Sequence, residues 1–147
     1  MLIAADDAAQ FLTAYKAMLT RAAGRTLSDF PAFVRARDAF FENSALLERP
    51  PTCDPQLLDA LRCACYGRFL ICRHMARATE MIGPDDRAYR VRGLTTELRD
   101  LVDSWVVADT AVMQFKGTWI CDGLIKSSNI HIGPNMRKDL LAKIRNG

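Results

Sequence analysis

Arginine is the residue type in this sequence that is best suited to chemistry. Fifteen of the twenty basic residues are Arg, and the formal net charge is +3. The planar guanidinium group binds a carboxylate or a phosphate through two hydrogen bonds at once, so an Arg-rich chain is suited to an anionic partner. The sequence pI of about 8.7 is modest for a nucleic-acid-binding domain, so charge alone does not identify that partner.

Four residues form the most suggestive cluster. If the chain is helical after Asp54-Pro55, then Arg62, Arg73 and Arg77 lie within about 60° of one another around the helix axis, with Tyr66 among them. Such a row suits phosphates or a stacked base. Pairing with acids of the same chain is the more common role, because Arg stems also cover apolar surface. The functional hypothesis is a site for nucleic acid or an acidic protein surface.

Cysteine and histidine offer weaker hypotheses. The candidate metal ligands are three cysteines close in sequence, Cys63, Cys65 and Cys72. They lack the Cys-x-x-Cys spacing that structural zinc prefers, so we expect no metal, and we expect no other cofactor. Asp122 and His131, with Cys121, form the one conceivable catalytic triad, provided that two strands bring them together. An enzyme with a site near Asp122 and His131 therefore remains an alternative.

The elements that position these residues include a β-hairpin. Thr110 to Phe115 and Thr118 to Ile125 are rich in apolar, aromatic and β-branched residues, and only Lys116-Gly117 separates them. This pattern predicts a hairpin with a two-residue turn, which pairs Met113 with Ile120. A third short strand is expected at residues 129–132. Three glycines are interpreted as turn or bulge residues: Gly117, Gly123 and Gly133.

The string FKGTWICDGLI, followed by NIHIG and Arg137, resembles a pattern of uncharacterised bacterial proteins. In that family an apolar strand ends in Phe-Lys-Gly, and the next strand carries Tyr-Asp-Gly-Leu. This chain has Cys121 at the position of the Tyr. The resemblance covers the last quarter of the chain and implies the hairpin, with Lys116, Gly117, Asp122 and Gly123 as its structural residues. It implies no activity.

The remaining sequence predicts helices. One is expected from Asp6 or Asp7 to about Ala23, a second from Ser28 or Asp29, and a short last one over 135–145. The strongest signal is Asp54-Pro55, an N-cap followed by an N1 proline, and the spacing of apolar residues after it predicts one helix to Ile82. We therefore expect a mainly helical α+β domain, a bundle around this long central helix with the hairpin and last helix at one side.

Length and composition limit the possible functions. The 147 residues are the size of one domain, expected to span 1–147, and no stretch has the length of a membrane span or the pattern of a signal peptide. An odd number of cysteines without an export signal favours reduced thiols in the cytoplasm. The first hypothesis is a binding or regulatory module for an anionic partner. The alternatives are a self-associating interaction domain, which forms a homo-oligomer, and the enzyme described above.

Overall fold

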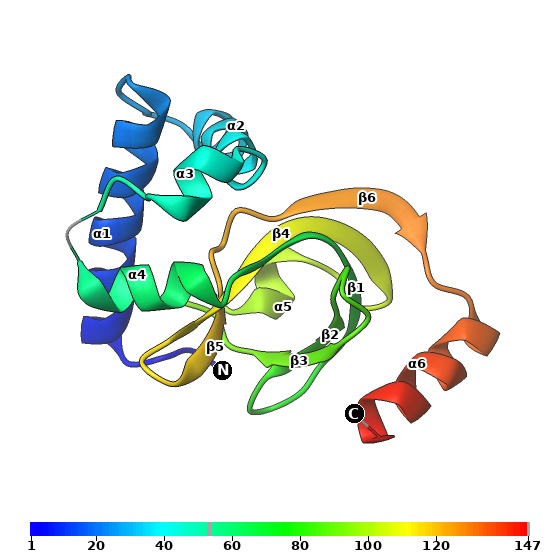
Figure 1. Ribbon diagram of the computed structural model, residues 1–147. Helices are drawn as coiled ribbons and strands as arrows, with labels where there is room; N and C mark the ends of the chain where they lie inside the picture. The colour runs from blue at the N-terminus through cyan, green and yellow to red at the C-terminus, as the bar shows by residue number, and fades with distance from the viewer. Residues whose placement is uncertain (53, 147) are drawn as a thin grey trace.

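The computed structural model describes residues 1–52 and 54–146. The helices are α1 (Ala5–Ala23), α2 (Phe30–Phe41), α3 (Ser44–Glu48), α4 (Pro55–Arg62), α5 (Leu98–Leu101) and α6 (Pro134–Asn146). The strands are β1 (Cys65–His74), β2 (Thr79–Ile82), β3 (Ala88–Val91), β4 (Val106–Phe115), β5 (Thr118–Cys121) and β6 (Lys126–His131). Figure 1 shows helices α1 to α4 on one side of a strongly curled sheet and α6 on the other.

The six strands form one antiparallel sheet in the order β3-β2-β1-β4-β5. Strand β6 pairs with the first half of β4, and β5 pairs with the second half. The sheet curls until its two ends meet: the N–H of Arg92, just after β3, donates to the carbonyl of Trp119 in β5 at 3.0 Å. The curled sheet is therefore the framework of the molecule (Figure 1).

This architecture contradicts the expected helical bundle. The helix that begins at Pro55 ends at Arg62, and the next twenty residues form β1, a turn and β2 instead of continuing to Ile82. Strand β1 alternates faces, with Phe69 and Ile71 inside the curl and Tyr66 outside. The apolar residues of this segment fit the period of a helix as well as the alternation of a strand. The segment forms a strand because it pairs with β2 on one side and with β4 on the other.

Two other helices follow the local signals in the sequence. Helix α1 ends at Gly24 in the left-handed conformation, with φ of 70°. The side chain of Asp29 caps α2 by accepting a hydrogen bond from the N–H of Ala32 at 2.8 Å. Helix α5 is a single turn, because the chain enters β4 soon after it, at Val106.

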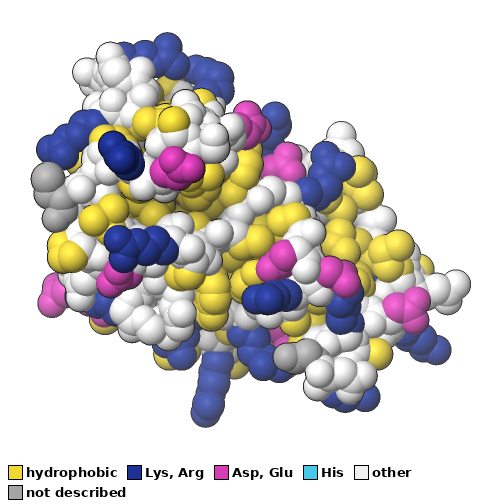
Figure 2. Space-filling model, viewed as in Figure 1, with side chains coloured by type: hydrophobic (Ala, Val, Ile, Leu, Met, Phe, Trp, Pro, Cys, Tyr) yellow, Lys and Arg dark blue, Asp and Glu magenta, His cyan; other side chains and the backbone are white. Residues whose placement is uncertain are grey.

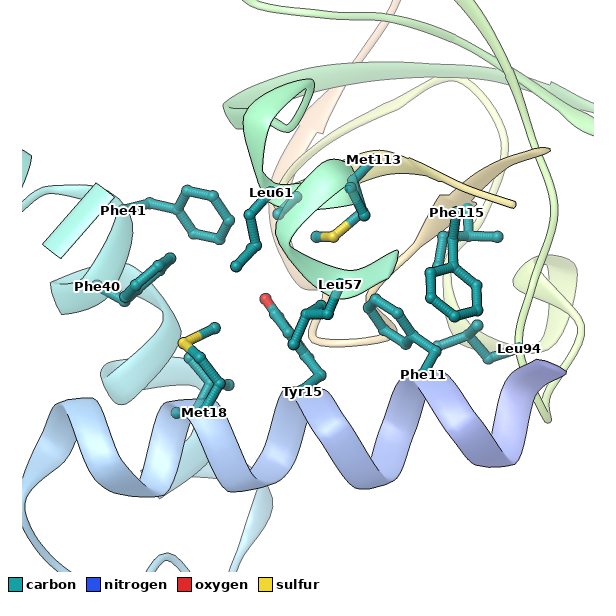
Figure 3. Close-up of a cluster of buried hydrophobic side chains, with 14 of the residues drawn as sticks. Phe11, Tyr15, Met18, Phe40, Phe41, Leu57, Leu61, Leu94, Met113 and Phe115 are labelled. Atoms are coloured by element: carbon teal, nitrogen blue, oxygen red, sulfur yellow. The ribbon is translucent and has the colours of Figure 1, made fainter. Parts of the chain in front are cut away.

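Helices α1 to α4, which we call the helical half, pack on the outer face of the sheet through one apolar cluster. Figure 3 shows Phe11, Tyr15 and Met18 pointing from α1 toward α4 and the strands. Leu57 and Leu61 come from α4, Phe40 and Phe41 from α2, and Met113 and Phe115 from β4. A second cluster, which includes Phe69, Met81 and Val112, fills the inside of the curl. A third lies under α6, around Leu140 and Ile144.

The hairpin agrees with the expected register. Phe115 lies opposite Thr118 and Met113 opposite Ile120, and the two turn residues, Lys116 and Gly117, have φ of 50° and 80°. Both values are positive, as the type I′ turn requires. Alternation along the hairpin places Met113 against the helices and its neighbour Val112 inside the curl.

Candidate functional site

The four residues of the expected cationic row do not share one stripe. Arg62 is exposed at the end of α4 and pairs with Asp59 at 3.3 Å. Arg73 lies near the far end of β1, where its Nε donates to the buried carboxylate of Glu80. Arg77 is exposed in the turn between β1 and β2. Because the long helix is not formed, these side chains belong to three different elements and not to one helical face.

Tyr66, the fourth member of that row, is held by the helical half. Its hydroxyl lies 3.0 Å from the carboxylate of Asp38 and 3.3 Å from that of Glu42. Its ring stacks on Phe41, with ring centroids 5.2 Å apart, and the guanidinium carbon of Arg37 lies over the ring, 5.4 Å from its centroid. These contacts fix the side chain between α2 and β1, so it serves packing here.

Asp122, directly after β5, is the centre of a buried polar cluster. Its carboxylate accepts two hydrogen bonds from Nη1 of Arg37, at 2.9 and 3.2 Å, and one from the hydroxyl of Tyr15 at 2.7 Å. Thr110 in β4 and the N–H of Leu124 donate to it as well, at 3.3 and 2.9 Å. The cluster joins α1, α2 and two strands at one point.

Burial controls the titration of this cluster. Loss of water raises the pKa of the Asp122 carboxyl, while the charge of Arg37 and the hydrogen bond from Tyr15 oppose that rise. Burial also raises the pKa of Tyr15 well above its usual range, and Asp122 adds to the effect. The lone pairs of Asp122 are engaged by donors and its side chain has no contact with solvent. The cluster therefore binds the elements together and is unsuited to attack on a substrate.

The conceivable triad is not assembled. The N–H of Asp122 donates to the carbonyl of Ala111, whereas His131 lies opposite Val106, five positions away along β4. Five residues of a strand span about 16 Å. His131 is also exposed on β6, whereas Asp122 is buried. The two residues consequently cannot act on one substrate atom in this arrangement.

The second histidine, the expected turn glycines and the cysteines have structural surroundings. His74 contacts the hydroxyl of Thr79 through Nδ1 and the carbonyl of Val102 through Nε2, both at 2.8 Å. Among the expected turn glycines, Gly117 and Gly123 have positive φ. Gly133 precedes α6, and its carbonyl accepts the N–H of Arg137 at 3.0 Å. Cys53 lies outside the described residues, and Cys63, Cys65 and Cys72 are free thiols.

A cationic hollow that the sequence interpretation missed lies where α1, α2 and α3 meet. Its volume is about 440 Å³, and Arg25 and Arg35 stand at its rim together with Asn43. Its apolar lining consists of Ala22, Ala23, Ala36, Ala39, Phe40 and Leu46. Figure 2 shows Lys and Arg side chains gathered over this end of the helical half. We call it the α1–α2 hollow.

The arginines at this end differ from those on the sheet. Arg68, Arg73 and Arg90 on the strands each pair with a carboxylate. Within residues 1–52 and 54–146, Arg25 and Arg35 have no carboxylate within 4.0 Å. Arg25 follows α1 and Arg35 is exposed on α2, so the two residues come together only where the helices pack, and no local pattern in the sequence marks the hollow.

Comparison of the chain with protein-family models, with curated proteins and with solved structures found no significant match. Within the described residues, no helix combines the length and apolar character needed to cross a membrane.

Proposed function

We propose that this chain is a cytoplasmic binding module that recognises an anionic partner through the α1–α2 hollow. The observation that carries the proposal is the pair Arg25 and Arg35, whose charges no carboxylate of the described chain neutralises at the rim of a hollow of about 440 Å³. Guanidinium groups with free donors are suited to carboxylates and phosphates.

An acidic protein segment fits the hollow better than nucleic acid does. The apolar part of the lining consists mainly of alanine side chains, which leaves room for an inserted aliphatic side chain flanked by carboxylates. Binding of single-stranded nucleic acid commonly uses aromatic side chains on which bases stack. Phe40, the aromatic residue in the lining, is only 1% exposed and offers no such platform.

The charges of Arg25 and Arg35 could stabilise the fold instead of binding a partner, and the helix dipole of α1 provides such a role for one of them. Arg21 lies in the last turn of α1, and Arg25 follows the helix closely, so both interact favourably with the negative end of the helix dipole. That interaction contributes about 0.3–1 kcal/mol for each charge. It does not apply to Arg35, which lies in the middle of α2. Loss of binding without a comparable loss of stability therefore separates the two roles.

The test is fluorescence anisotropy with a labelled Glu-rich peptide that contains leucine, and with a labelled single-stranded oligonucleotide, across a series of salt concentrations. Arg25→Glu with Arg35→Glu is expected to weaken peptide binding by about tenfold or more and to flatten its salt dependence. The matched control is Arg62→Glu with Arg77→Glu, which changes the net charge by the same amount at two exposed residues outside the hollow. Equal effects of both pairs would refute the hollow as the site. If the oligonucleotide binds and the peptide does not, and that binding also requires Arg25 and Arg35, the partner of the hollow is nucleic acid and not an acidic protein segment.

Self-association through β6 is a second candidate function. Among the described residues, strand β6 pairs only with β4, along one of its sides, and Ile130 on it is 52% exposed. An open strand edge is a template for pairing with another chain, although a charged residue such as Lys126 opposes it. Sedimentation at increasing protein concentration tests this candidate. A monomer at every concentration would exclude it.

A further inference from the structure

A second hollow lies beside the middle of α1, next to the loop that follows β5. Its volume is about 320 Å³, within the range of small-molecule sites. Its walls come from α1, from the segment that contains α5 and from the loop 121–124. A hollow of about 280 Å³ adjoins it and shares Leu12, Lys16, Phe30, Asp122 and Leu124 with it. We call the larger of the two the Lys16 hollow.

Apolar side chains make up most of the lining of the Lys16 hollow. Leu94 and Leu98 are buried beneath it. Phe30 and Leu101 line it and are 54% and 43% exposed, which places two large apolar side chains in contact with solvent at the same hollow. A Cβ added at Gly123 would meet no heavy atom within 4 Å, so the space beside the loop is open. The hollow therefore offers an unfilled apolar surface to a ligand.

The charges at this hollow are few. Lys16 is exposed on α1, and no carboxylate of the described residues lies within 4.0 Å of it. Asp122 contributes to the lining, but Arg37 neutralises its charge and donors occupy its oxygens. Asp29 lines the adjoining hollow, where it caps α2. The hydroxyls of Thr95 and Thr96 are exposed in the wall and can donate hydrogen bonds.

We propose that the Lys16 hollow binds a small amphipathic carboxylic acid, with the carboxylate at Lys16 and the apolar part between Phe30, Leu101 and Leu98. One ammonium group beside an apolar surface of this size matches a ligand with one negative charge and an apolar body. A phosphate ester or a sugar would leave most of its polar groups without partners in this hollow. This site is independent of the α1–α2 hollow and of the acidic partner proposed for it.

Octanoate is the probe for this site, and 1-octanol is its uncharged control of equal chain length. In amide NMR spectra of the full chain, octanoate is expected to shift the signals of Thr95, Thr96 and Gly123 in a saturable way. Octanoate should bind about tenfold more tightly than octanol, because its head group makes a charge-assisted contact. Shifts centred on another surface would overturn the proposal.

Variants assign the two parts of the ligand. Lys16→Met is expected to reduce octanoate affinity to that of octanol, whereas Lys126→Met, the same change on exposed β6, leaves it unchanged. Leu101→Ser should weaken octanoate and octanol alike, since it removes apolar wall and not charge. Thermal melting of each variant confirms that it is folded. Unchanged preference for octanoate in Lys16→Met would refute the head-group position, and unchanged affinity in Leu101→Ser would refute the apolar wall.

Discussion

Nη1 of Arg37 donates to both carboxylate oxygens of Asp122, 85 residues later in the chain, and neither side chain has any contact with solvent. Burying two charges costs desolvation energy, which a well-formed pair and its further hydrogen bonds must offset. Tyr15 and Thr110 supply those bonds. We infer that the pair fixes how α2 docks on the sheet, because other placements of the helix would leave a charge buried alone.

Asp122→Asn tests this inference. The amide leaves the buried guanidinium of Arg37 without a counter-charge, so the free energy of unfolding should fall by about 3–5 kcal/mol. Urea denaturation followed by circular dichroism measures the change. The control is Asp109→Asn on β4, where the carboxylate pairs with exposed Arg68 at 3.6 Å. An exposed pair contributes about 0–1 kcal/mol, so similar losses in the two variants would contradict the inference.

Local signals in the sequence predicted part of this fold. A helix cap or a tight turn depends on a few neighbouring residues, so the sequence shows it directly. Helix α2 begins after Asp29, α4 begins at Pro55, and the hairpin turns at Lys116-Gly117, as these residues indicate. Arg37 carried no such signal, because its partner lies 85 positions away and only the folded chain brings the two together. The α1–α2 hollow depends in the same way on contact between two helices.

The long helix expected after Pro55 was wrong for a reason visible at Gly67. Its φ of 143° is a conformation that side chains other than glycine rarely adopt, and it lies within β1 where the chain passes close to Pro84. The spacing of apolar residues between Pro55 and Ile82 fits a helix, but Gly67 within that segment disfavours one. Alternation of Phe69 and Ile71 supported a strand equally well.

Gly67→Ala distinguishes the two conformations by the sign of its effect. In a helix, replacement of an interior glycine by alanine stabilises by about 1 kcal/mol. In β1 the added Cβ would lie 3.2 Å from Cγ of Pro84 and would force a residue with a side chain to positive φ. We therefore expect a loss of about 1–3 kcal/mol in urea denaturation. A gain in stability would contradict the strand.

Stability should fall at alkaline pH because of Cys121. Burial raises the pKa of this thiol to about 12, and the nearby Asp122 adds to the rise. An unfolded thiol loses its proton near pH 8.5, whereas the folded one keeps it. The stabilisation from the folded thiol is complete below about pH 8.5 and is lost as pH rises toward 12, because the unfolded state then binds fewer protons than the folded state.

Urea denaturation at several values of pH above 8 measures this slope. Cys121→Ala should make it shallower by up to about 1.4 kcal/mol per pH unit, the contribution of one proton. Slopes are compared rather than absolute stabilities, since the variant also leaves a small cavity. Cys63→Ala, at an exposed thiol, is the control. A slope that Cys121→Ala leaves unchanged would show that this thiol ionises equally in both states.

The turn of the hairpin gives the last prediction, in which two neighbouring substitutions have different outcomes. Gly117 has φ of 80°, which a β-branched residue resists, so Gly117→Val should cost about 1–3 kcal/mol. Lys116 has φ of 50°, a conformation that Asn tolerates better than Lys. However, Lys116 also pairs with Asp7 of α1 at 2.7 Å, so Lys116→Asn exchanges an ion pair for a better turn.

Thermal melting should therefore show a drop of several degrees for Gly117→Val and almost none for Lys116→Asn. Trp119 lies two residues beyond Gly117 and opposite Gln114, so its fluorescence reports on the hairpin. Fraying of the turn in Gly117→Val exposes the indole to water and shifts its emission to longer wavelength. Lys116→Ala separates the two effects at that position, because it loses the ion pair without improving the turn, and it should melt below Lys116→Asn. Equal melting of Gly117→Val and the parent protein, with unchanged emission, would exclude a tight turn at these residues.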